Sequence, residues 1–239
     1  KIIKKEFQYF LGIKIDLGKG WKTYWKNPGD AGEAIKIDWE NKKDIKEYEL
    51  MFPYPKKFLD SGITTIGYEN EIVFPIRIDF ADNLKFFKSN ITIEYLVCKD
   101  ICIPKKVKKY VKYNLKKYAE NSPKNEIEEY LKKVPKNNNL FFEIEKERIN
   151  QNSFLIKIKN SSHLNENIDA FAYVNSDKHD VEVSVRKKNG EFLVEVYSES
   201  NLDNILEPIE ISLSDGKLYQ VFNISSKNLP PKKKLIYFF

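Results

Sequence analysis

Apolar and polar residues alternate along several short segments in the first half of the chain. An extended backbone has a repeat of two residues, so this alternation predicts β-strands that bury one face. We predict such strands over residues 7–17, 34–39, 72–80 and 91–97. The third is the clearest, because its apolar residues all fall on one face: Ile72, Phe74, Ile76, Ile78 and Phe80.

Turn-forming residues separate these predicted strands. Asn, Asp, Gly and Pro cluster at residues 27–30, 52–55 and 60–62, where their backbone preferences favour bends. Short strands spaced by such turns are typical of a β-sandwich. We therefore predict an all-β fold, with a β-sandwich as the first domain.

The pattern changes near residue 121. Ser122 and Pro123 form a helix-start signal, and Ile127, Tyr130, Leu131 and Val134 follow at helical spacing. Pro135 and the polar residues 136–139 predict the end of this helix and a linker. We thus expect a first domain over residues 1–120, a helical linker over 121–139 and a second domain over 140–239.

The second half returns to strand patterns and contains no cysteine. Asn189-Gly190 and Asp215-Gly216 predict hairpin turns, because Gly and Asn tolerate the positive φ that tight hairpins need. The expected strands cover residues 141–145, 153–159, 170–174, 181–187, 192–197, 209–213 and 216–224. The whole chain is therefore predicted to contain two β domains joined by a short helix and linker.

Composition and charge narrow the classes of function. The net charge of +6 comes mainly from Lys, and Arg occurs only at Arg77, Arg148 and Arg186. Specific nucleic-acid recognition favours Arg, so we expect no nucleic-acid partner. No run of about 18 to 20 apolar residues is present, so the sequence predicts no membrane span. Motifs for phosphate binding, serine hydrolysis and zinc hydrolysis are also absent from the sequence.

The two cysteines, Cys98 and Cys102, are the strongest chemical signal. On a straight strand their Cα atoms would lie about 13 Å apart, too far for a disulfide, so a turn must separate them. Lys99, Asp100 and Ile101 can form that turn at the end of a hairpin. A bond closing so short a loop adds little stability, which favours an exchangeable redox pair over a structural bond.

Three alternatives remain open for the cysteines. They could form an inert structural disulfide in an adhesion or structural sandwich, or they could stay reduced in the core. They could also bind copper with a distant histidine, for which His163 and His179 are the candidates. Both histidines lie in the other predicted domain, so we expect no metal and no cofactor.

Several segments in order resemble a known family. They are Gly20-Trp21-Lys22-Thr23-Tyr24-Trp25-Lys26-Asn27-Pro28-Gly29-Asp30-Ala31-Gly32, Ile37-Asp38-Trp39, Phe52-Pro53-Tyr54-Pro55, Gly67-Tyr68, Val73-Phe74-Pro75 and Val97-Cys98-Lys99-Asp100-Ile101-Cys102-Ile103-Pro104. Together they resemble the N-terminal periplasmic domain of the thiol:disulfide interchange protein DsbD, in the branch that includes ScsB. The resemblance covers roughly residues 7–115, with a C-x3-C spacing that is tighter than in the best-known DsbD domain.

The resemblance implies an immunoglobulin-like sandwich, so we expect two immunoglobulin-like β-sandwich domains joined by a short helix and linker. It also implies a function for the cysteine pair. It implies a periplasmic protein-disulfide reductase or electron relay, in which a membrane-embedded donor passes electrons through Cys98 and Cys102 to thioredoxin-like periplasmic proteins. By similarity, Cys102 would exchange with the partner and Cys98 would resolve the mixed disulfide. Trp21, Tyr24 and Tyr68 are candidate aromatic shields, and Asp100 is a candidate for assisting proton transfer.

Overall fold

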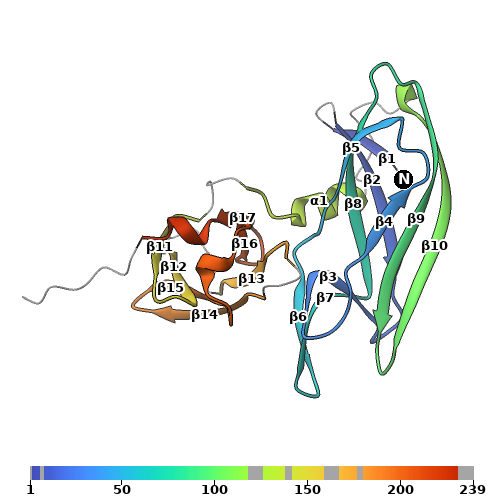
Figure 1. The fold of residues 1–239 in the computed structure, drawn as a ribbon. Helices are drawn as coiled ribbons and strands as arrows, with labels where there is room; N and C mark the ends of the chain where they lie inside the picture. Colours follow the sequence, from blue (N-terminus) through green and yellow to red (C-terminus); the bar gives the residue numbers. More distant parts are fainter. Residues whose placement is uncertain are drawn as a thin grey trace, which may run out of the picture. The chain divides into compact units, whose positions relative to one another are not determined.

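The chain forms two compact units, Lys1–Val134 and Pro135–Phe239 (Figure 1). This computed structural model describes residues 2–5, 8–117, 126–137, 142–158, 167–176 and 180–230. Among these described residues, the strands pair antiparallel in both units. The predicted all-β, immunoglobulin-like fold class is confirmed.

The first unit contains two sheets. One has the strand order β1-β2-β8-β5, and the other has the order β10-β9-β3-β7-β6, with β4 also paired to β9. The bounds of the first sheet are β1 Ile2–Lys5, β2 Gln8–Asp16, β5 Ile45–Leu50 and β8 Glu71–Phe80. Those of the second are β3 Lys22–Gly29, β4 Lys36–Trp39, β6 Lys56–Asp60, β7 Ile63–Glu69, β9 Phe86–Cys98 and β10 Cys102–Asn114.

The interior of the first unit lies between these sheets. Phe74 and Ile76 of β8 are fully buried, and the ring of Tyr68 from the opposite sheet packs on Phe74 with centroids 5.3 Å apart. At the other end of β8, Phe80 packs on Phe87 of β9 at 4.7 Å. The predicted apolar face of this strand is therefore the buried face that joins the sheets.

Helix α1, Glu126–Lys133, covers the outer face of the first sheet. Its Ile127 is 2% exposed and packs with Ile3, Phe10 and Val73. Close approach requires Gly12 in β2, because a Cβ there would lie only 2.7 Å from Cγ1 of Ile127. The helix thus belongs to the first compact unit. A 3-10 turn, η1 (Leu115–Lys117), follows the end of β10.

The second unit also has two sheets, with orders β11-β12-β15-β14 and β13-β16-β17. Their apolar faces share one buried cluster that includes Phe154, Val194, Ile211 and Phe222. The strands are β11 Ile144–Arg148, β12 Ser153–Ile158, β13 Asp169–Tyr173, β14 Glu182–Lys188, β15 Glu191–Tyr197, β16 Ile209–Ser214 and β17 Tyr219–Ile224, with 3-10 turns η2 Leu202–Asn204 and η3 Ser226–Asn228.

Two turns predicted from the sequence can be compared with the structure. The Asn189-Gly190 hairpin is confirmed between β14 and β15, with φ of 51° and 82°. The turn predicted over residues 27–30 is instead the end of β3, where the pairing with β7 shifts register between Tyr24 and Gly29. The exact domain boundaries stay a prediction.

Candidate functional site

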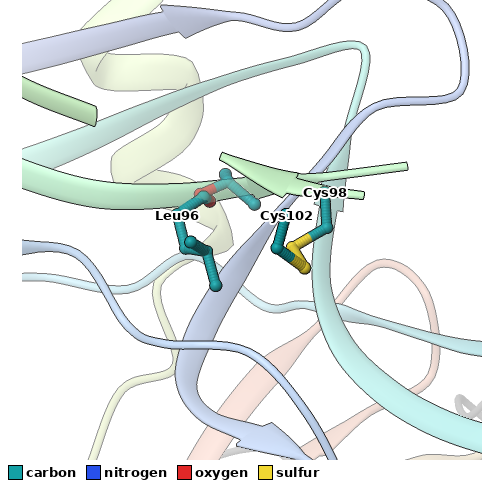
Figure 2. The surroundings of a disulfide bond; sticks show 4 residues. Leu96, Cys98 and Cys102 are labelled. Carbon is teal, nitrogen blue, oxygen red and sulfur yellow. A yellow bond between two sulfur atoms is a disulfide. The ribbon is translucent and has the colours of Figure 1, made fainter. Parts of the chain in front are cut away.

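The disulfide joins two long strands at the end of a hairpin. Cys98 ends β9 and Cys102 begins β10, and the two residues are direct partners in the pairing register. Their Cα atoms are 4.1 Å apart, and Figure 2 shows the sulfur–sulfur bond at the strand ends. The amide of Lys99 donates to the carbonyl oxygen of Ile101 at 3.1 Å within the intervening turn. The turn expected at residues 99–101 therefore brings the two sulfurs together.

The two sulfur-bearing residues differ in exposure. Cys98 is 6% exposed, whereas Cys102 is exposed. The cause is the strand order: β9 lies between β10 and β3, while β10 is the edge strand. A partner can therefore reach the sulfur of Cys102 more easily than that of Cys98.

On the other side of Cys98 lies Lys22. Lys22 begins β3 and is the direct register partner of Cys98. Directly opposed residues on neighbouring strands place their side chains on the same face, with Cβ atoms about 5 Å apart. The hydroxyl of Thr23, the next residue, donates to the carbonyl oxygen of Leu96 at 3.0 Å and holds the two strands together.

The Lys22 side chain also contacts the β6–β7 hairpin. Its ammonium pairs with the carboxylate of Asp60 and lies 4.4 Å from the ring centroid of Phe58. The side chain of Lys22 is only 18% exposed, whereas that of Asp60 is 67% exposed. The register partner of Cys98 thus has its ammonium held by a carboxylate and an aromatic ring of β6.

The structure separates the three aromatic residues that the sequence suggested as shields. Tyr24 is two residues after Lys22 on β3 and is 4% exposed. Its pKa is raised, mainly by burial and secondly by the charge of Asp60, so it shares the surroundings of Lys22. Of the three, Tyr24 is therefore the one on the disulfide side of the sheet.

Tyr68 and Trp21 face elsewhere. Tyr68 donates a 2.6 Å hydrogen bond to the carbonyl oxygen of Pro53 inside the sandwich, and burial raises its pKa well above the usual value. Trp21 lines an open groove with Val97 and Ile103, the neighbours of the cysteines whose side chains point to the opposite face. Both aromatic residues therefore support the sheet from its other side.

The turn between the cysteines is polar and open. Lys99, Asp100 and Ile101 are all exposed, and Ile101 is 67% exposed. Asp100 occupies the turn position that the sequence assigned to it. It lies two residues before the exposed Cys102. Its role in proton transfer stays a prediction.

Sequence analysis did not single out Lys22, Phe58 or Asp60 as site residues. Lys22 lies within a segment that carried the family resemblance, but no spacing pattern links it to Cys98. Phe58 and Asp60 are 40 and 38 residues before Cys98, in a strand that lacks a regular apolar face. Only the pairing of distant strands brings them to this site.

No metal centre accompanies the cysteines in the described ranges. Residues 2–5, 8–117, 126–137, 142–158, 167–176 and 180–230 contain no group of three or more His, Cys, Asp or Glu side chains placed to bind an ion. His163 and His179, the histidines considered for copper, lie outside the described residues. Among the described helices, none is long and apolar enough to cross a membrane.

Comparisons with known proteins agree with this geometry. The family described as "Thiol:disulfide interchange protein DsbD, N-terminal" matches residues 5–113. The crystal structure of the N-terminal periplasmic domain of ScsB from Proteus mirabilis aligns with a TM-score of 0.71 and 18% sequence identity, covering 97% of this chain and 92% of that chain. No curated protein matches the chain. The ScsB alignment shows a shared fold that extends through both units.

Proposed function

We propose that this protein relays electrons between thiol-disulfide proteins in the periplasm. Residues 5–113 match a DsbD-like N-terminal domain, and this domain carries the Cys98–Cys102 disulfide. The observation that carries the proposal is the unequal pair itself: an exposed Cys102 bonded to a buried Cys98. Thiol-disulfide exchange requires one reachable sulfur and a second sulfur that stays within bonding distance.

The reaction begins when the thiolate of a reduced donor attacks the sulfur of Cys102. The bond between Cys98 and Cys102 breaks, a donor–Cys102 disulfide forms, and Cys98 leaves as a thiolate. A second donor thiolate then attacks the donor sulfur of that mixed disulfide and releases Cys102. The donor has lost two electrons, and this protein holds them as two thiols after taking up two protons.

Delivery to an acceptor reverses these roles. The Cys102 thiolate attacks the acceptor disulfide and forms a mixed disulfide, which the Cys98 thiolate then cleaves. The acceptor leaves reduced, and the Cys98–Cys102 bond forms again. We assign a membrane-embedded thiol-disulfide protein as the donor and thioredoxin-like periplasmic proteins as acceptors, in accordance with the family resemblance.

The position of the bond supports exchange over a structural role. A disulfide that closes a five-residue loop restricts the unfolded chain by only about 2 kcal/mol, against about 4.7 kcal/mol for a 100-residue loop. The β9–β10 hairpin already joins the two strands through 13 residues each. The fold thus has little need of this bond.

Thiol trapping tests the proposal. The whole chain is equilibrated in glutathione buffers between about −150 and −300 mV, alkylated, and its free thiols are counted by mass spectrometry. A relay should change from disulfide to dithiol within this range. A bond that stays oxidised throughout the range would reject the proposal and support an inert disulfide.

A further inference from the structure

The charged surroundings of Cys98 point to a residue that controls its reactivity. We propose that Lys22 stabilises the thiolate of Cys98 and that Asp60 competes with this thiolate for the Lys22 ammonium. The inference deepens the proposed function, because it rests on Cys98 being the sulfur that leaves when a donor attacks Cys102.

The burial of Cys98 creates the need for such a residue. A thiol that is 6% exposed pays a desolvation cost on losing its proton, and this cost raises its pKa and slows its departure as a leaving group. A nearby cation offsets that cost. An opposite charge within about 4–6 Å shifts a pKa by about 1–3 units.

Lys22 meets the geometric requirement. It is the register partner of Cys98 on β3, so the two side chains leave the same face of the sheet from Cβ atoms about 5 Å apart. Its side chain is 18% exposed, so its charge is less screened than that of a fully solvated lysine. The four-carbon chain of Lys can carry the ammonium toward either Asp60 or the sulfur of Cys98.

The remaining charged groups near Cys98 are less well placed. Lys99 and Asp100 are exposed in the turn and carry opposite charges. Further along the same face of the hairpin, Lys106 pairs with Glu94 at 2.5 Å, so these two charges largely cancel. Glu69, the register partner of Lys22 on β7, pairs instead with Lys56 at 2.9 Å. Lys22 is therefore the cation from a neighbouring strand that acts on Cys98, and Asp60 on β6 is the anion that pairs with it.

In the disulfide state, no thiolate is present and Lys22 pairs with Asp60, as observed. Cleavage of the bond creates a negative charge on Cys98. The Lys22 ammonium is then shared between this sulfur and Asp60. The ion pair between Lys22 and Asp60 should consequently weaken on reduction.

A single-thiol variant tests this inference directly. In Cys102→Ser, Cys98 is the only thiol, and its pKa is read from thiolate absorbance near 240 nm. Adding Lys22→Met should raise this pKa by about one unit or more, because the cation is lost. Adding Lys22→Arg should change it by only a few tenths of a unit. Adding Asp60→Asn should lower it, because the competing carboxylate is removed.

The opposite signs distinguish an electrostatic role from a structural one. Loss of the Lys22–Asp60 contact alone would move the pKa in the same direction in Lys22→Met and Asp60→Asn. Lys46→Met is the matched control, since Lys46 pairs with Asp82 at 2.6 Å at β5 of the other sheet, and it should leave the pKa of Cys98 unchanged. If Lys22→Met fails to fold, the Asp60→Asn and Lys22→Arg variants still test the sign.

Equal pKa values in Cys102→Ser with and without Lys22→Met, or shifts of the same sign in the Lys22 and Asp60 variants, would overturn the inference. This measurement does not depend on exchange with any partner. Resistance of the wild-type disulfide to glutathione would reject the proposed function while the role of Lys22 could still be confirmed. The two failures are therefore distinguishable.

Discussion

Cys98 and Cys102 face each other across the β9–β10 hairpin with Cα atoms 4.1 Å apart, yet only Cys102 is exposed. The asymmetry arises because β9 has neighbours on both sides while β10 is an edge strand. It gives each sulfur a different expected part in exchange.

The first prediction concerns the roles of the two cysteines in thiol-disulfide exchange. Cys98→Ser should trap a long-lived mixed disulfide between Cys102 and a thioredoxin-like partner, because the thiolate that resolves it is missing. Cys102→Ser should trap none, because Cys98 is buried. Non-reducing electrophoresis followed by peptide mass spectrometry would identify the bond. Trapping by Cys102→Ser instead would reverse the assignment of the two cysteines.

The second prediction concerns stability. Replacing both cysteines with Ala should lower the free energy of unfolding of the first unit by about 2 kcal/mol or less, because the loop is short and the β9–β10 pairing persists. Urea unfolding measures this change. Phe74→Ala removes a fully buried ring and should cost about 3–5 kcal/mol, which provides the scale. A comparable loss from the double cysteine variant would show that the bond is structural.

The third prediction concerns Tyr68 at neutral pH. Tyr68→Phe removes the donor of the 2.6 Å hydrogen bond to Pro53 and leaves a buried carbonyl oxygen without it. The variant should be less stable by about 1–3 kcal/mol in urea unfolding at pH 7. Its redox behaviour should match that of the wild type, since Tyr68 lies inside the sandwich. A changed redox midpoint would instead support the shielding role that the sequence suggested.

The same tyrosine gives a prediction for alkaline pH. Burial raises the pKa of Tyr68 in the folded state above the value of about 10 in the unfolded chain. Its contribution to stability is thus complete below pH 10 and is lost as the pH rises toward the folded-state pKa. The stability difference between wild type and Tyr68→Phe should therefore shrink between pH 7 and pH 11. A constant difference would contradict the burial of this hydroxyl.

The last prediction concerns the extent of the first unit. Ile127→Ala should destabilise it by about 2–5 kcal/mol, because Ile127 fills the contact with Ile3, Phe10 and Val73. A fragment of residues 1–134 should accordingly unfold at higher urea concentration than one of residues 1–120. Equal midpoints for the two fragments would mean that the helix is a linker, as the sequence suggested.

The sequence by itself determined the strands with a regular apolar face and the chemistry of the cysteine pair. In β8, alternation identified the face that meets the second sheet, because an extended strand repeats every two residues. It did not identify Val73 and Pro75, which are buried on the other face, Val73 against helix α1. The four-residue separation of Cys98 and Cys102 required a turn, since a straight strand would hold the sulfurs too far apart. The different roles of the two sulfurs came from the family resemblance, whereas their unequal exposure depends on β3, which pairs with β9 but not with β10.

Tertiary structure decided which distant residues surround the sulfurs. The pattern of β6 shows no buried face, because its residues are mostly exposed, and β3 ends in Pro28 and Gly29, which predicted a turn. The packing of helix α1 also escaped the sequence, since its amphipathic pattern does not say which sheet it covers. Lys22 lies beside Cys98 because β3 pairs with β9 across 76 residues of sequence. Local patterns record the periodicity of one strand, whereas the choice of its neighbour depends on how all the apolar faces are buried together.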